Sequence, residues 1–199
     1  MKKLFLFVLF FVFAIYSSYG QKDVSETGHL RFMGIEMTGS ISDFIDKLED
    51  KGMTVYSQDN SNAVLLGRFA GKDAMIDVFT TPKSNMVHGI EVIFNNTKND
   101  WSYLKSQYLN IKEMLSNKYG KPVEMEYFEK PDTEGSGNEL YELKEGKGAY
   151  QSTFLPEGLL DEGMIVLSIK ASYTNPYVGL NYVDGKNSKL YMSESLEDL

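Results

Sequence analysis

Two segments of the chain carry apolar residues at intervals of three and four positions, which predicts two amphipathic helices. The first lies between Ser40, whose hydroxyl can cap the helix start, and Gly52, which stands just past the end. The second extends from Trp101 to Tyr119 and stops before Gly120. Each helix is therefore expected to bury one face and to expose the other.

After each predicted helix, apolar residues alternate with polar ones, a pattern typical of strands with one buried face. Short turns separate these runs, so neighbouring strands are expected to pair antiparallel. The predicted strands cover residues 53–58, 63–70, 74–80 and 86–95 after the first helix, and residues 122–129, 149–155, 164–172 and 177–184 after the second.

Three smaller features complete the pattern. Residues 139–145 favour a short helical turn. Asp184 and Gly185 resemble a tight turn that leads into a last short strand at 190–192. The acidic end of the chain, 193–199, is expected to fray.

The order of one helix, a glycine and four strands occurs twice along the chain. Each predicted sheet has one apolar face and each helix one apolar stripe, so the helices are expected to pack on one sheet face. The expected fold is α+β, built from tandem repeats of a helix plus a four-stranded antiparallel sheet, at about 29–96 and 97–192. Residues 21–199 are expected to form a single domain.

The first twenty residues predict a cleavable signal peptide. Lys2 and Lys3 precede the unbroken apolar run 4–15, and the small residues within 18–20 suit cleavage before Gln21. The run is too short for a membrane span, which needs about 20 apolar residues, so no stable membrane insertion is expected after cleavage. The chain has no cysteine to carry a lipid, so the prediction is an exported protein, periplasmic or extracellular, that is not a lipoprotein.

Charge and composition narrow the possible partners. Without residues 1–20 the chain holds 28 acidic and 18 basic residues, a net charge of −10 with neutral histidines, and a nucleic acid partner is not expected. The absence of cysteine excludes disulfides and thiolate metal sites. No glycine-rich phosphate loop occurs either, so neither a cofactor nor a metal site is predicted.

The strand predicted at 86–95 carries two candidates for chemistry, His88 and Glu91. By its alternation His88 is expected to point to the core face, either as a general base or as a histidine satisfied by a backbone carbonyl or water at the sheet rim. Glu91 lies among apolar neighbours and is the candidate carboxylate of a hydrolase, or else a side chain on the solvated outer face. His29, the other histidine, falls in the polar lead-in near the start of the exported chain.

The tyrosine content of the second half indicates a binding surface, because tyrosine combines a large contact area with a polar tip. Tyr150 and Tyr182 are the binding candidates. With Tyr141, Tyr173 and Tyr177 they are expected to line the open face of the second sheet. Ordinary packing of tyrosines within strands is the alternative.

Several short motifs carry a family resemblance. They are Phe32-Met33-Gly34-Ile35, Gly39-Ser40, Phe44-x-x-x-Leu48-x-x-Lys51-Gly52, Trp101, Leu115-x-x-Lys118-Tyr119-Gly120-x-Pro122 and Tyr182-x-Asp184-x-x-Asn187. With these motifs the chain resembles small exported proteins of gut-type Bacteroidetes, which are largely uncharacterised. Its element order is similar to the tandem-repeat fold of the beta-lactamase inhibitory protein type, which implies a concave sheet face that binds protein but transfers no site residue.

These observations together predict an exported, non-catalytic module that binds a protein, a peptide or a partner in the cell envelope. A hydrolase that uses carboxylates is one alternative, with Glu91 and His88 as its first candidate residues. A carrier of a small ligand is the other, and a large apolar pocket would favour it.

Overall fold

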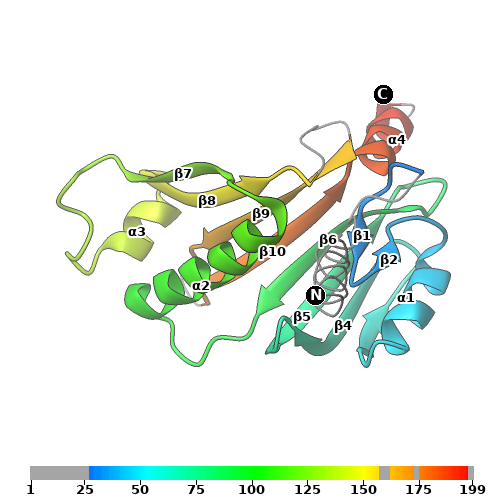
Figure 1. The fold of residues 1–199 in the computed structure, drawn as a ribbon, viewed down its shortest axis with the longest axis horizontal. Coiled ribbons are helices and arrows are strands. Elements are labelled where there is room, and N and C mark those ends of the chain that lie inside the picture. Colours follow the sequence, from blue (N-terminus) through cyan, green and yellow to red (C-terminus); the bar gives the residue numbers. More distant parts are fainter. Residues whose placement is uncertain (1–26, 157–161, 173–174, 197–199) are drawn as a thin grey trace, which may run out of the picture.

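The computed structural model describes residues 27–156, 162–172 and 175–196, which form an eight-stranded antiparallel sheet with four helices packed against it (Figure 1). The predicted α+β class and the antiparallel sheet are confirmed. The predicted signal peptide, residues 1–20, and Tyr173 lie outside the described residues.

The sheet consists of two four-stranded halves that join at its centre. The first half contains β3 (Thr54–Gln58), β4 (Asn62–Phe69), β5 (Lys72–Thr80) and β6 (Val87–Phe94). The second half contains β7 (Val123–Phe128), β8 (Gly148–Phe154), β9 (Gly163–Lys170) and β10 (Tyr177–Asp184). The spatial order is β3-β4-β5-β6-β10-β9-β8-β7, so the last strand of each half pairs with the other.

The helices are α1 (Ile41–Glu49), α2 (Trp101–Tyr119), α3 (Glu139–Lys144) and α4 (Gly185–Leu196). The first two begin at capping side chains. Oγ of Ser40 accepts a hydrogen bond from the backbone N–H of Asp43 at 3.2 Å, and Oδ1 of Asp100 accepts one from Tyr103 at 2.9 Å. Each bond satisfies a backbone donor that the first turn of a helix leaves free. The helices predicted before each half of the sheet and the short helix near residue 139 are therefore confirmed.

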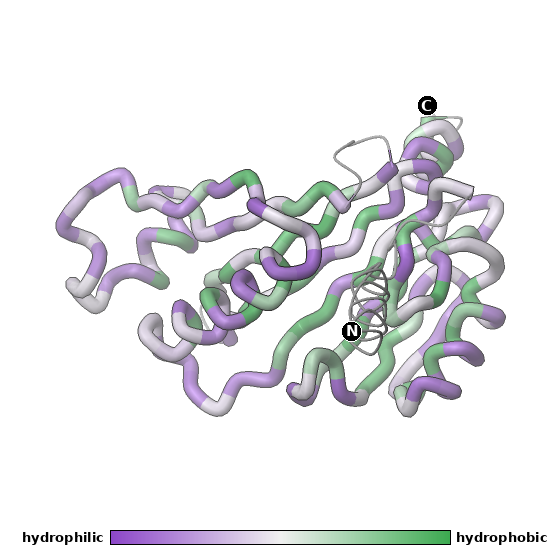
Figure 2. Tube along the Cα trace, in the orientation of Figure 1, coloured by the Kyte–Doolittle hydropathy of each residue, from purple (hydrophilic) through white to green (hydrophobic). Residues whose placement is uncertain are grey.

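One face of the sheet is covered by α1, α2 and a small ribbon of β1 (Arg31–Phe32) and β2 (Ile35–Glu36) (Figure 1). We name it the covered face. The ring of Phe32 stacks on Phe69 with 5.2 Å between centroids and meets the edge of Tyr182 at 5.1 Å. From α2, Tyr108 is fully buried, and its hydroxyl lies 2.7 Å from Oγ of Ser152. The hydrophobic stretches of β5, β6 and β10, green in Figure 2, supply the sheet side of this core.

The end of the chain differs from the prediction. A helix, α4, replaces the expected short strand at 190–192 and extends into the tail that was expected to fray. Oδ1 of Asp184 accepts a hydrogen bond from the backbone N–H of Asn187 at 2.9 Å, so the aspartate caps a helix instead of forming a tight turn with Gly185. The described part of this tail, up to Leu196, is held as well, because the buried Glu194 accepts hydrogen bonds from the backbone N–H groups of Lys83 and Ser84. Residues 197–199 lie outside the described residues.

Each half of the sheet follows one long helix, as expected, but α3 interrupts the second half between β7 and β8. The equivalence of the two halves as tandem repeats stays a prediction. No helix within the described ranges is long and apolar enough to cross a membrane.

Candidate functional site

No described helix lies over the centre of the sheet face opposite α1 and α2, which we name the open face. Helix α4 contacts the sheet near the ends of β6 and β10, at Val87 and His88. Alternation along each strand places every second side chain there. Polar side chains are frequent towards the edges of this face, whereas most side chains at its centre are apolar. The central members, from β4 to β6 and from β9 and β10, are Val64, Leu66, Met75, Asp77, Phe79, Glu91, Ile93, Met164, Val166, Asn181 and Val183.

Two carboxylates face each other at the centre of the open face. Asp77 of β5 is directly opposite Glu91 of β6, and Asn181 of β10 is opposite Glu91 on the other side. The Cβ atoms of such cross-strand pairs are about 4.5–5.5 Å apart, and like charges in this position repel. Among the described residues, no cationic side chain forms an ion pair with either carboxylate.

Asp77 is poorly satisfied in this position. Its Oδ1 atom is buried and accepts no hydrogen bond from any described residue. Burial raises the pKa of Asp77 above its ordinary value, and the charge of Glu91 raises this pKa further. The ionised form of the pair is therefore unfavourable until a donor or a cation reaches it.

Glu91 is held in place from β10. The hydroxyl of Tyr177 donates a hydrogen bond to Oε1 of Glu91 at 3.2 Å, and burial together with the charge of Glu91 raises the pKa of Tyr177 to about 12. Gly179 makes this contact possible. A Cβ atom at that position would lie 3.1 Å from Cε2 of Tyr177 and 3.2 Å from Oε1 of Glu91. The missing side chain lets the tyrosine ring lie against the sheet and reach the carboxylate.

Glu91 thus lies on the outer face, as one of the two interpretations had it, but half-buried beside a second carboxylate. The alternation of β5 indicated that Asp77 points away from the buried Ile76 and Val78. Its position opposite Glu91 was missed, because that position depends on the register between β5 and β6. Tyr177 was expected on the open face and is found there.

His88 does not join Glu91, and the alternation from which its core-face position was expected is interrupted at this residue. The register shifts between Phe79 and Thr80, so that Phe79 is opposite Gly89 while Thr80 is opposite Val87. His88 is the extra residue of this β-bulge, which breaks the alternation of β6. Its ring stacks on Tyr191 of α4 with 4.5 Å between centroids. Burial lowers the pKa of His88, against the opposing effect of the charge of Asp184.

Tyr150 and Tyr182 are not on the open face, and that expectation is corrected. Both rings are buried on the covered face. Tyr150 packs edge-on against Trp101 at 4.7 Å between centroids, and its hydroxyl donates to Oε2 of Glu134 at 2.6 Å. Helix α2 and the loop before α3 cover the tyrosine, so the ordinary packing interpretation holds for its position. The exposed Tyr141 lies on α3 rather than on a strand.

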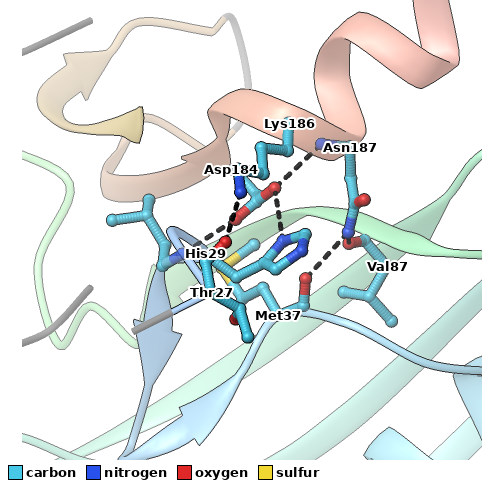
Figure 3. A network of polar contacts seen from close by, with 8 residues as sticks. Thr27, His29, Met37, Val87, Asp184, Lys186 and Asn187 are labelled. Carbon is cyan, nitrogen blue, oxygen red and sulfur yellow. Dashed lines mark hydrogen bonds and ion pairs between the residues drawn. The ribbon is translucent and has the colours of Figure 1, made fainter. Parts of the chain in front are cut away.

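A buried polar network closes one end of the sheet (Figure 3). The carboxylate of Asp184 is fully buried and accepts hydrogen bonds from Nδ1 of His29 at 3.1 Å and from the backbone N–H of Leu30 at 2.8 Å. Nδ2 of Asn187 donates to the carbonyl oxygens of Met37 and Val87, each at 2.8 Å. His29 is therefore part of the fold rather than of a loose lead-in. The hydrogen bonds of Asp184 connect the end of β10 to the segment before β1 and to the start of α4, which indicates a structural role.

The described hollows lie away from the Asp77–Glu91 pair. An apolar hollow of about 200 Å³ lies between α2 and the turn after β4, walled by residues such as Phe69, Leu115 and Tyr182. A polar groove of about 490 Å³ runs between α2 and the loop before α3, beside Lys105 and Glu134. No group of three metal-ligating side chains occurs in the described part of the chain.

The chain matches no protein-family model, and comparison with curated proteins and with solved structures found no match. The candidate site therefore depends on geometry alone.

Proposed function

We propose that this protein is an exported, non-catalytic binding module whose open face engages a protein or peptide partner. The observation that carries the proposal is the half-buried Asp77–Glu91 pair among apolar side chains at the centre of the open face, which no described helix covers. Apolar area without a covering layer is typical of interaction surfaces. The proposal includes cleavage after Gly20, action outside the cytoplasm, and a sheet composed of two repeats joined at β6 and β10.

The edge of the sheet extends this surface. On β7, Val123, Met125 and Tyr127 point to the open face and are strongly exposed. They form an apolar strip at the edge of the open face, separated from the apolar centre by Thr153 and Gln151 of β8, and they widen the area that a partner can cover. Exposed aromatic and methionine side chains are enriched at protein interfaces.

A hydrolase is supported less well. Glycoside hydrolysis uses two catalytic carboxylates, but such pairs lie in a cleft or pocket that holds the substrate. Neither Asp77 nor Glu91 lines a hollow that the structure describes, and His88 contacts Tyr191 of α4 instead. A small-ligand carrier is supported only by the apolar hollow beside Tyr182, whose volume of about 200 Å³ is below the range of ordinary ligand sites.

Site-specific photocrosslinking in the source cells tests the proposal. A photoreactive residue at Val166, at the centre of the open face, is expected to trap a discrete partner band. The same residue at Glu49, on the solvent side of α1, is the matched control and is expected to trap none. Equal labelling from both positions, or no band from Val166, would contradict binding through the open face.

A further inference from the structure

We propose that the partner presents a lysine or arginine side chain to Asp77 and Glu91, flanked by apolar residues of an extended segment. This inference rests on the proposed function and names the chemistry of the partner. The site is the centre of the open face, where β5, β6 and β10 lie side by side.

Charge complementarity is the first argument. The two carboxylates are directly opposite each other, and no described residue supplies a cation to them. An ammonium or guanidinium group between them donates hydrogen bonds to both and removes their mutual repulsion. It also gives Oδ1 of Asp77 the donor that it lacks. A neutral apolar occupant would leave that oxygen buried without a partner, which is unfavourable.

The neighbours of the pair specify the flanking residues. Along the strands, Met75 and Ile93 lie on one side of the two carboxylates and Phe79 lies on the other. An extended segment that places its cation over the pair therefore sets the side chains two positions before and after the cation against apolar surface, because alternate side chains share one face. A basic residue with apolar residues two positions away on either side satisfies both requirements.

The acceptor geometry is arranged before the partner arrives. The hydroxyl of Tyr177 holds Glu91 at 3.2 Å, and the absence of a side chain at Gly179 leaves room for this contact. A carboxylate that is already oriented loses less side-chain freedom on binding. The site therefore favours a cation at one defined position rather than a diffuse basic surface.

The test uses the protein expressed from its full coding sequence, labelled with ¹⁵N and titrated with a synthetic peptide, acetyl-Thr-Leu-Thr-Lys-Thr-Val-amide, whose leucine, lysine and valine share one face when it is extended. The comparison peptide has glutamine in place of lysine. We expect the lysine peptide to shift the backbone amide signals of Asn181 and Glu91, and to bind at least about tenfold more tightly than the glutamine peptide. The double substitution Asp77→Asn with Glu91→Gln is expected to abolish this preference, whereas Asp73→Asn is expected to preserve it. Asp73 lies on the same strand and face but 3.7 Å from Arg68, with which it forms an exposed ion pair.

The outcomes separate the two proposals. If both peptides bind the open face equally and the double substitution has no effect, the proposed recognition of a basic side chain is wrong. Binding through the open face would still stand. Photocrosslinking at Val166 that is undiminished in the double variant would also contradict recognition of a basic side chain by Asp77 and Glu91. If the peptides shift no amide signal of the open face and Val166 traps no partner, the proposed binding function itself is wrong. Thermal melting of each variant shows whether a lost signal reflects unfolding instead.

Discussion

His29 donates a hydrogen bond from Nδ1 to the fully buried Oδ1 of Asp184 at 3.1 Å, although 155 residues separate the two in the sequence. The same carboxylate accepts the backbone N–H groups of Leu30 and Asn187. One side chain thus fastens the start of the folded region, the end of β10 and the start of α4 to one another. This relationship accounts for the ordered contacts at both ends of the described chain.

Asp184→Asn is expected to lower the free energy of unfolding by about 2–3 kcal/mol, because an amide cannot accept all of these hydrogen bonds and leaves a buried donor unsatisfied. Urea denaturation measures the change. Asp46→Asn, on the exposed side of α1, is the matched control and is expected to change stability by less than about 0.5 kcal/mol. A loss no larger than that of the control would show that Asp184 does not fasten the ends.

His88 is expected to make stability fall as the pH falls below about 6.5. Burial lowers the pKa of His88 in the folded protein, so the unfolded chain takes up a proton first as the pH decreases, and unfolding becomes more favourable. The contribution is fully present above the unfolded pKa and is lost on the acid side of it. Urea denaturation of the wild-type protein and of His88→Gln between pH 8 and pH 5 measures the difference. A difference that does not change with pH would contradict the lowered pKa.

Asp77→Asn is expected to stabilise the unbound protein at pH 7 by about 0.5 kcal/mol, since it removes the like-charge contact with Glu91. The raised pKa of Asp77 gives the sign: the wild-type protein loses stability as the pH rises through that pKa, and the variant does not. The advantage should shrink at high salt and vanish at low pH. Asp73→Asn, which removes an exposed ion pair, should not stabilise. A destabilised Asp77→Asn would show that the carboxylate supports the fold.

Gly179→Ala is expected to displace the Tyr177 ring from Glu91, because the new Cβ atom would lie 3.1 Å from Cε2 of the tyrosine. The pKa of Tyr177, about 12 in this contact, should then move down towards the ordinary value for tyrosine. NMR titration of the labelled tyrosine ring measures the shift.

Gly89→Ala is the control for that substitution, since Gly89 lies in the same sheet and a Cβ atom there would meet its nearest neighbours at 3.8 Å, an ordinary van der Waals contact. This second variant should leave the Tyr177 titration unchanged. Identical titration curves for the two alanine variants would mean that Gly179 does not shape the site.

Features that depend on neighbouring residues in the sequence could be predicted, and features that depend on pairing could not. Ser40 caps the first helix through a bond that spans three residues, so local pattern was sufficient. Asp184 followed by Gly185 fits a tight turn and a helix start equally well, and the distant His29 and Leu30 favour the second. The bulge at His88 is visible only in the pairing with β5.

The candidate site shows the same division. Alternation placed Glu91 on a face opposite its apolar neighbours, but its pairing with Asp77 required the register of two strands. Tyr150 lies on the covered face because α2 and the loop before α3 pack over it, and its hydroxyl bonds to Glu134 of that loop. The position of these two segments is not visible in the local sequence. A period of two distinguishes the two sides of a strand without stating which side will be covered.

The strand nearest the end of the chain is also at the centre of the sheet, where β10 pairs with both β6 and β9. The ribosome releases β3 to β6 long before β10, and until then β6 keeps an unpaired edge. The two halves have no seam until Tyr177–Asp184 has emerged. Pairing of the two halves is therefore a late event in the synthesis of the chain, and a truncation that removes β10 as well as α4 would leave two separate groups of strands rather than a shortened sheet.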